Sequence, residues 1–269
     1  MTPLCHTFVL QKESAMNFKQ AIVRRPGRSI VAGLSLSSGE PPVYEKALEQ
    51  HRHYVAALTT CGVTVRELDP LEEYPDSTFV EDVAVLTPHC AVMTRPGAAS
   101  RKNEVSSMAQ TLTPIFSAVE TINPPGTLDG GDILQIGSHF FIGQSQRTNR
   151  SAAQQFIAIV EKYGMRGSTV TVNDVLHLKT GVTAISTSTL VAAGEFIDHP
   201  AFHDFEVIPV GRNEEGAANC IACHGQIIMP AGFPETRETL KPFATDIIEV
   251  DISEFAKIDG GLTCLSLRF

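Results

Sequence analysis

Tryptophan is absent from the 269 residues, aromatic residues make up only 7%, and no apolar stretch approaches the length needed to span a bilayer. A run of five or more basic residues is also missing, and 21 Lys and Arg against 30 Asp and Glu leave a net charge of −9. Such a chain is a poor partner for nucleic acid or anionic lipid, and neither is expected. With 43% apolar residues and a mean hydropathy of +0.03, it can instead build a large buried core.

The first residues also lack the marks of a secretion signal. No basic leader is present, and the apolar patch covers only residues 7–10. We interpret residues 1–15 as an extension with little ordered structure, followed by a single α/β domain over residues 16–269. The six cysteines are even in number, but without a signal peptide we expect free thiols in a reducing, cytoplasmic compartment.

An internal repeat emerges when the turns are aligned. Turn glycines at positions 97, 143, 194 and 232 each follow a short apolar run, which is preceded by a second apolar run containing polar residues. A helical stretch and a strand usually come next, so a ββαβ unit recurs about every 45 residues. The turn at 25–27 resembles a fifth copy, whose missing first strand would come from residues 262–269. We therefore predict an α/β fold of five units closed into a ring around a central cavity.

Helices are predicted from apolar residues that recur with a period of 3.6. The pattern favours helices over residues 43–58, 105–116 and 156–163, and a further helix beginning near Pro234. Gly164 can end the third of these in a left-handed conformation.

Four segments place polar or reactive side chains inside runs that should be buried. The first is PDSTFVEDV, with three carboxylates at positions 76, 81 and 82, which need cationic partners if they are buried. Pairing with Arg24 or Arg95, or a position on an exposed edge strand, is the structural alternative. The others are LDGGD at 128–132, LHLKTG at 176–181 and GGLTC at 260–264. Taken singly, the first is more simply a turn, the second a histidine in the core, and the third a small buried cysteine.

Their position in the repeat strengthens the case for chemistry. Asp82, Asp129 or Asp132, His177 and Cys264 all occupy the leading strand of a unit, and equivalent strand ends in a closed ring point at one cavity. A cysteine, a histidine and an acid form a set of nucleophile, base and orienting residue. The additional carboxylates predict a cationic substrate, and a planar guanidinium or amidine suits them.

Cys220, Cys223 and His224 match the spacing of a haem attachment site. The segment is predicted to be a hairpin that turns at His224 and Gly225. Residues 220 and 223 would then face opposite sides of the strand, so we expect neither haem nor metal there.

Seven motifs in order, PDSTFVEDV, TRPGAASR, LDGGD, QRTN, LHLKTG, AANC and DGGLTC, resemble the dimethylarginine dimethylaminohydrolase family of the pentein (guanidine-modifying) superfamily. The resemblance extends from Phe18 to Phe269. It implies a five-fold pseudosymmetric α/β propeller that hydrolyses Nω-methylated and Nω,Nω-dimethylated arginine to citrulline and an alkylamine. No cofactor or metal is implied, and the enzyme would be a monomer or a homodimer.

The resemblance also implies roles for individual residues. Cys264 would be the nucleophile, His177 the general acid and base, and Asp129 the residue that orients the imidazole. The implied substrate-binding residues are Asp82 with Glu81 beside it at the guanidinium, Arg101 and Arg147 at the α-carboxylate, Asp76 and the main chain of Leu34 at the α-amino group, and Ile258 along the wall.

Two other functions compete with this one. An arginine deiminase would run the same chemistry on unmethylated arginine, but family members of that kind carry an extra helical insertion for which 269 residues leave no room. A binding protein without turnover would need no complete set of Cys264, His177 and Asp129.

Overall fold

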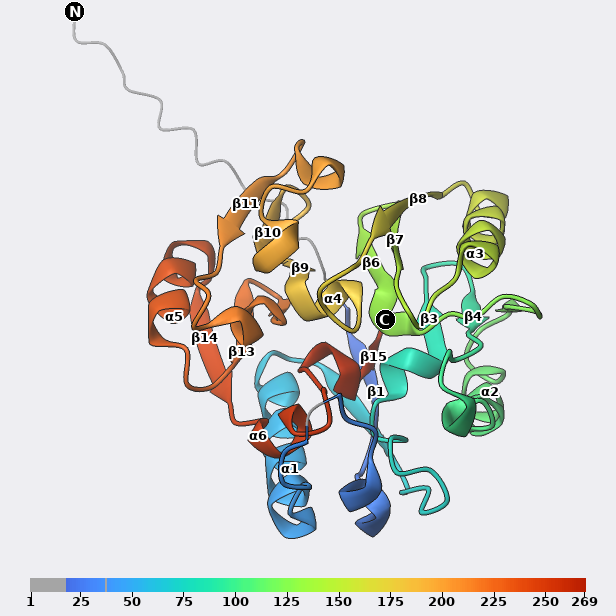
Figure 1. Ribbon diagram of the computed structural model, residues 1–269, viewed down its shortest axis with the longest axis horizontal. Coiled ribbons are helices and arrows are strands. Elements are labelled where there is room, and N and C mark those ends of the chain that lie inside the picture. The colour runs from blue at the N-terminus through green and yellow to red at the C-terminus, as the bar shows by residue number, and fades with distance from the viewer. Residues whose placement is uncertain (1–17, 37) are drawn as a thin grey trace, which may run out of the picture.

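The computed structural model describes residues 18–36 and 38–269. The proposed extension over residues 1–15 lies outside this part of the chain. Five small sheets stand as blades around a central axis (Figure 1). Among the described residues, none of the helices is both long enough and apolar enough to cross a membrane.

Every blade contains three strands in the same arrangement. The first strand is antiparallel to the middle one, and the middle strand is parallel to the third. In ring order, the blades are β15 (Leu267–Arg268), β1 (Gln20–Arg24) and β2 (Thr64–Leu68); β3 (Ala84–Leu86), β4 (Ala91–Met93) and β5 (Val119–Thr121); β6 (Ile133–Ile136), β7 (His139–Gln144) and β8 (Arg166–Thr171); β9 (Val182–Ala184), β10 (Thr189–Ala192) and β11 (Glu206–Pro209); and β12 (Ile221–Cys223), β13 (Gln226–Pro230) and β14 (Asp246–Val250).

The C-terminal strand closes the ring, as predicted. In the first blade, Ala21 pairs with Arg268 and Ile22 pairs with Leu267. Because β15 supplies the strand that the N-terminal unit lacks, Cys264, which lies directly before it, is brought to the centre of the molecule.

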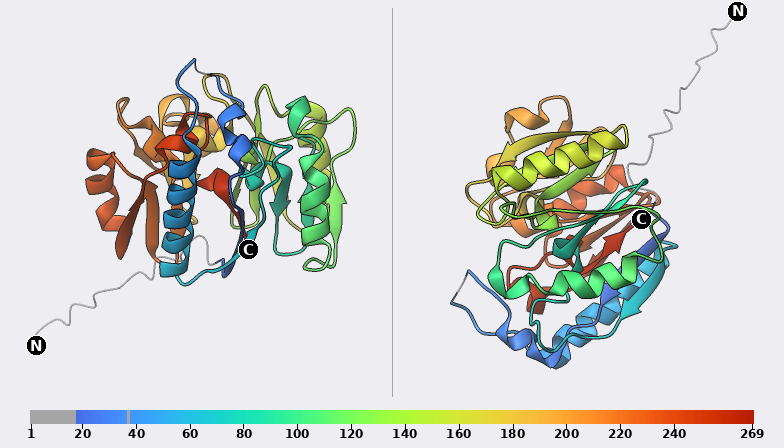
Figure 2. Two further views of the ribbon diagram at one scale, coloured as in Figure 1. Left: turned by 90° about the horizontal axis from the view of Figure 1, so that it is seen from below. Right: turned by 90° about the vertical axis from the view of Figure 1, so that its right-hand side faces the viewer.

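A helix connects the middle strand to the third strand in four of the blades, and these helices cover the outside of the ring (Figure 2). They are α1 (Tyr44–Thr60), α2 (Glu104–Leu112), α3 (Arg150–Lys162) and α5 (Pro234–Leu240). The four predicted helices are confirmed, with shifted ends, and Gly164 has the expected positive φ of 73°. The fourth blade crosses instead through two 3₁₀ turns, Gly194–Phe196 and Pro200–Phe202, because a proline inside this segment opposes a continuous helix.

The prediction that polar residues occupy the leading strands was wrong in detail. They lie in or directly beside a short helical turn that precedes each first strand: Val80–Val83, Gly130–Asp132, α4 (Leu178–Gly181), Glu215–Ala218 and Thr263–Leu265. Such turns leave backbone N–H groups free to donate hydrogen bonds to side chains. Gly131 N donates to the buried carboxylate of Asp82, and Leu178 N donates to that of Asp132. The remaining helix, α6 (Ser253–Ala256), precedes the last of these turns.

Gly143 also differs from its predicted place in a turn. It lies inside β7, where a Cβ atom would meet Asp132 Oδ1 at 2.7 Å. A glycine is required here because another side chain approaches the strand closely.

Buried apolar side chains form five clusters among the blades and helices. Cys220 belongs to one cluster and Cys223 to another, while His224 and Gly225 have positive φ angles of 48° and 81°. The predicted hairpin is therefore confirmed, and Cys220, just before β12, and Cys223, inside it, pack into different parts of the core.

Candidate active site

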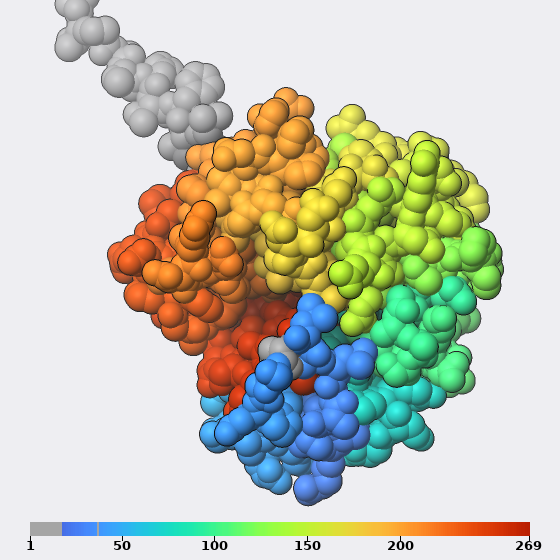
Figure 3. Space-filling view, in the orientation of Figure 1, coloured from blue at the N-terminus to red at the C-terminus, as the bar shows by residue number. Residues whose placement is uncertain are grey.

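A small cavity of about 30 Å³ lies where the helical turns converge. On this face the space-filling view shows a hollow near the centre of the ring (Figure 3). Eight of the ten predicted site residues line the cavity: Leu34, Asp76, Asp82, Arg101, Arg147, His177, Ile258 and Cys264. Asp129 lies behind His177, whereas Glu81 lines a different cavity.

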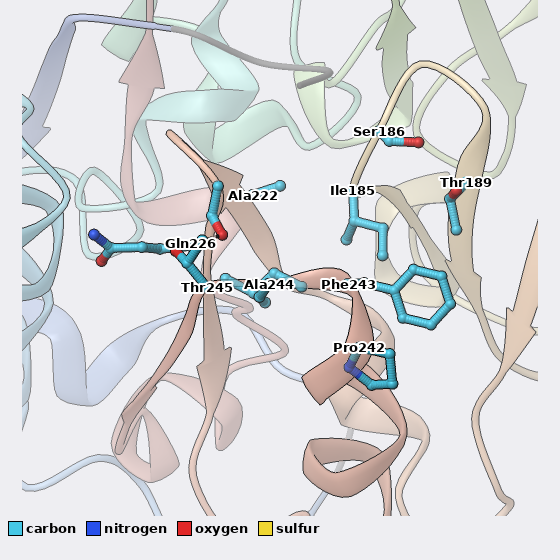
Figure 4. A pocket seen from close by; sticks show the side chains of 11 residues that line it. Ile185, Ser186, Thr189, Ala222, Gln226, Pro242, Phe243, Ala244 and Thr245 are labelled. Atoms are coloured by element: carbon cyan, nitrogen blue, oxygen red, sulfur yellow. Dashed lines mark hydrogen bonds between the residues drawn. The ribbon is translucent and has the colours of Figure 1, made fainter. Parts of the chain in front are cut away.

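Two larger cavities lack this chemistry. One, of about 280 Å³, lies between the fourth and fifth blades and is lined by no charged side chain (Figure 4). The other, of about 370 Å³, shares no lining residue with the small cavity. Size alone therefore does not identify the site; the converging reactive groups do.

The histidine and its acid form a hydrogen-bonded pair. His177 Nε2 donates to Asp129 Oδ2 over 2.9 Å, and Asp129 is completely buried. The backbone N–H of Gly97 donates to the other Asp129 oxygen over 2.8 Å. Gly131 lies close against the imidazole, since a Cβ atom there would meet His177 Nδ1 at 2.8 Å. Asp129 and Gly131 thus set the position of the ring.

The electrostatic surroundings keep His177 protonated at neutral pH. Burial opposes its charge, but the carboxylate of Asp82, the hydrogen bond to Asp129 and the carboxylate of Asp132 together raise the pKa of His177 to about 9. An imidazolium at this position can donate a proton to a leaving group.

Cys264 lies in the turn Thr263–Leu265, and its Sγ accepts a bond from Gly261 N over 3.5 Å. Burial, together with the carboxylates of Glu81 and Asp82, raises the pKa of this thiol to about 12. The protein's own charges therefore favour a neutral thiol beside an imidazolium in this site. A cation bound in the cavity would offset the carboxylates and favour the thiolate.

Asp82 is one of three aspartates that line the cavity. Its Oδ1 accepts from Gly131 N, and its Oδ2 accepts from Arg101 Nη1. Burial opposes its charge, but His177 and Arg101 lower its pKa, so Asp82 is ionised. The structure therefore pairs Asp82 with Arg101 and not with the predicted Arg24 or Arg95.

Several groups besides Asp82 hold the Arg101 side chain. Its guanidinium also donates to both carboxylate oxygens of Glu104 and to the carbonyls of Asp76 and Phe79. Arg101 thus holds Asp82 and also lines the cavity, and its contact with an α-carboxylate stays a prediction. Arg147 is more accessible: its side chain is 19% exposed, and Nη1 lies 3.6 Å from Asp129.

Asp76 closes the side of the cavity near the first blade. Its Oδ1 accepts from the backbone N–H of Leu34 over 2.9 Å, and burial raises its pKa. These are the two residues predicted to meet an α-amino group. Asp259 lines the same side with a positive φ of 57° and accepts from Leu36 N.

Glu81 is held by groups on the side of the turn opposite Asp82. Its carboxylate is bound by Lys179, Arg268 and Thr263. Neither Arg24 nor Arg95 is its partner. Glu81 does not line the small cavity, and its place beside Asp82 at the substrate stays a prediction.

Asp82, Asp129 and His177 each place a ligand atom within 4.8 Å of the others, so they are the described residues that could hold a metal ion. The atoms are already engaged, however: Arg101 binds Asp82, and His177 donates its proton to Asp129. A protonated imidazole is no metal ligand, so this arrangement favours proton transfer.

Comparisons with known proteins identify the family. The family model described as "N,N dimethylarginine dimethylhydrolase, eukaryotic" matches residues 35–266. The N(G),N(G)-dimethylarginine dimethylaminohydrolase of Pseudomonas aeruginosa is 49% identical over 94% of this chain and 100% of its own length. The enzyme of that name from Streptomyces coelicolor is 39% identical over 94% of this chain and 98% of its own.

The chain belongs to the dimethylarginine dimethylaminohydrolase family.

A solved structure of the Pseudomonas aeruginosa enzyme, in a cysteine-to-serine variant complexed with citrulline, matches with a TM-score of 0.93 over 94% of this chain and all of that chain. The N-terminal domain of ArgZ, an arginine dihydrolase, matches with a TM-score of 0.84 at 17% identity, covering 93% of this chain and 97% of that domain. The second likeness shows the shared fold alone.

Sequence reasoning missed four residues that line the cavity of this dimethylarginine dimethylaminohydrolase family member: Phe79, Leu176, Asp259 and Gly260. All four lie inside or next to motifs that carry the family resemblance. Their position in the motifs was therefore a usable signal, although nothing in their chemistry distinguished them.

Proposed function

We propose that this protein hydrolyses asymmetric dimethylarginine and monomethylarginine to citrulline and dimethylamine or methylamine. The observation that carries the proposal is the convergence of Cys264, the His177–Asp129 pair and ionised Asp82 on one cavity. A thiol nucleophile, a proton donor and an anion are what displacement of an amine from a guanidinium carbon requires.

The substrate guanidinium would pair with Asp82, and this positive charge would lower the pKa of the neighbouring Cys264, which releases its proton to solvent. The thiolate attacks the guanidinium carbon. His177, which enters this step as an imidazolium, protonates the departing alkylamine, and the C–N bond breaks. An S-alkylthiouronium remains on Cys264.

Hydrolysis of this adduct uses the same histidine in the reverse direction. Neutral His177 takes a proton from water, and the hydroxide adds to the thiouronium carbon. Collapse of the tetrahedral species releases citrulline and the thiolate, and the proton of the added hydroxyl passes to solvent. His177 is again an imidazolium stabilised by Asp82 and Asp129.

The other end of the substrate would meet Arg147 and Asp76. The guanidinium of Arg147 is the more accessible cation for an α-carboxylate, and the Asp76 carboxylate lies with the main chain of Leu34 where an α-amino group can bind. Ile258 packs along the wall. Arg101 supports this function by holding Asp82 ionised.

All groups that the reaction needs come from one chain, which is compatible with either a monomer or a homodimer. We also propose a cytoplasmic location, since the mechanism needs Cys264 as a free thiol and the described cysteines are unpaired.

Citrulline release from asymmetric dimethylarginine, monomethylarginine and arginine, measured in parallel, tests the proposal. Turnover of the two methylated substrates with little turnover of arginine supports it. Arginine as the best substrate indicates a deiminase, and no citrulline from any of the three refutes the hydrolase. Cys264→Ser is expected to abolish turnover while leaving the melting temperature nearly unchanged, because the hydroxyl is nearly isosteric but far less nucleophilic.

A further inference from the structure

We propose that Asp132 is a positioning residue, whose buried carboxylate holds the turn carrying His177 and the loop carrying Arg147 at a fixed spacing without touching substrate. This inference rests on the proposed function, which places His177 and Arg147 at opposite ends of one substrate. The geometry that carries it is the set of hydrogen bonds that this one carboxylate accepts from two separate segments of the chain.

Asp132 lies beneath the active site and not in its wall. It ends the turn Gly130–Asp132, is completely buried, and is not among the residues that line the active-site cavity. Gly143 leaves room for its carboxylate, because a Cβ atom at that position would meet Asp132 Oδ1 at 2.7 Å. A substrate in the cavity would therefore meet His177 and Arg147 but not Asp132.

One oxygen of the Asp132 carboxylate holds the turn that carries the proton donor. Oδ1 accepts from the backbone N–H of Leu178 over 2.9 Å. Leu178 directly follows His177 and begins α4, so this bond fixes the turn on which the imidazole stands. Burial opposes the charge of His177, but the carboxylates of Asp82, Asp129 and Asp132 together raise its pKa. Asp132 thus acts on His177 through both position and charge.

The other oxygen holds the loop that carries Arg147. Asp132 Oδ2 accepts from Ser145 Oγ over 2.7 Å. The same Ser145 oxygen accepts from the backbone N–H groups of Arg147 over 3.0 Å and of Thr148 over 3.3 Å. One carboxylate therefore links the proton donor to the more accessible cation of the cavity through a single hydroxyl.

Only a group that accepts at both of its ends fits between these two donors. The Leu178 N–H can only donate, and the Ser145 oxygen already accepts from two N–H groups. An asparagine at position 132 would turn its NH₂ group toward one of the two donors, so one link must break and leave a buried donor unsatisfied. The two held segments would then shift relative to each other, and the substrate would be misaligned.

The test compares Asp132→Asn and Ser145→Ala with Glu214→Gln and Ser186→Ala as matched controls. Glu214 is also a buried carboxylate that accepts backbone N–H bonds, and Ser186 Oγ also accepts from the backbone N–H two residues later. Neither control residue lines the active-site cavity. Both controls should therefore match the unmodified enzyme.

With asymmetric dimethylarginine, Asp132→Asn should lower kcat about tenfold or more and raise KM about threefold or more, because both segments lose their common anchor. Ser145→Ala should raise KM by a similar factor with kcat within about twofold, because only the loop of Arg147 is released. The decline of kcat at high pH should begin at lower pH in Asp132→Asn, since one of the charges that raise the pKa of His177 is gone. Ser145→Ala keeps that charge, so its pH profile should not move.

Amide hydrogen exchange, followed by mass spectrometry without substrate, reports the two links independently of turnover. Asp132→Asn should exchange faster than the unmodified protein over residues 145–149 and over residues 177–181. Ser145→Ala should exchange faster over residues 145–149 alone. These rates separate a loss of positioning from a loss of charge.

A change confined to kcat or to KM in Asp132→Asn would show that Asp132 serves only one end of the site and would overturn the proposal, as would unchanged kinetics. If Asp132→Asn does not fold, as judged by circular dichroism, the KM of Ser145→Ala decides, and an unchanged value overturns the proposal. If the unmodified enzyme releases no citrulline, the proposed function fails by itself. The exchange rates then still decide whether Asp132 holds both segments: equal rates in Asp132→Asn and the unmodified protein over either segment overturn the inference.

Discussion

Gly131→Ala should displace the catalytic imidazole without unfolding the protein. The new Cβ would lie 2.8 Å from His177 Nδ1 and 3.1 Å from Asp82 Oδ1. Since ordinary carbon contacts begin near 3.4 Å, the ring must move by about 0.6 Å, and a misplacement of this order costs about tenfold to a hundredfold in rate. The measurement is kcat for citrulline release from asymmetric dimethylarginine.

The same displacement carries His177 away from the carboxylates that raise its pKa to about 9. The pKa of His177, followed by NMR, should therefore fall in Gly131→Ala. Gly211→Ala is the matched control, because a Cβ there meets nothing within 4 Å and the backbone φ is not left-handed. A Gly131→Ala enzyme with kcat within twofold of the unmodified protein would refute the claim that this glycine sets the ring position.

Three further changes test the electrostatics. His177 has a pKa of about 9 in the folded protein, above its value near 6.5 in the unfolded chain. Its protonation therefore adds about 3 kcal/mol to the free energy of unfolding, which is fully present below pH 6.5 and lost as pH rises through 9. In urea unfolding, His177→Gln should lack this decrease of stability with pH. Burial and Arg25 lower the pKa of His51 to about 4. The free energy of unfolding should therefore fall by about 3 kcal/mol as pH drops from 6.5 to 4, and His51→Leu should not show this decrease. Asp82→Asn removes the largest contribution that raises the His177 pKa, and NMR titration should show it lowered; an unchanged value would exclude Asp82 as its cause.

Much of the fold follows from local patterns in the sequence. The recurring turns and the 3.6-residue periods correctly predicted five units, four outer helices and closure by the C-terminal strand. The hairpin at His224 was also predicted correctly, and Cys220 and Cys223 pack into different parts of the core. These features depend on neighbours in the chain, which is why one sequence is sufficient to find them.

The turns before the first strands were not predictable in the same way. Asp82 and His177 stand in or beside helical turns of only a few residues, where neither a period of two nor one of 3.6 develops. A strand was expected because the flanking residues are apolar, but buried carboxylates that accept backbone N–H bonds favour a turn.

By itself the sequence determined the ring of five units, the family, and the residue types that meet at its centre. Only the tertiary structure decided that Glu81 does not line the small cavity, that Arg101 is bound to Asp82, and that the resting pair is a neutral thiol with an imidazolium. The reason is physical. Ion pairing, burial and protonation depend on distances between residues far apart in the chain, and these distances exist only after the blades have closed.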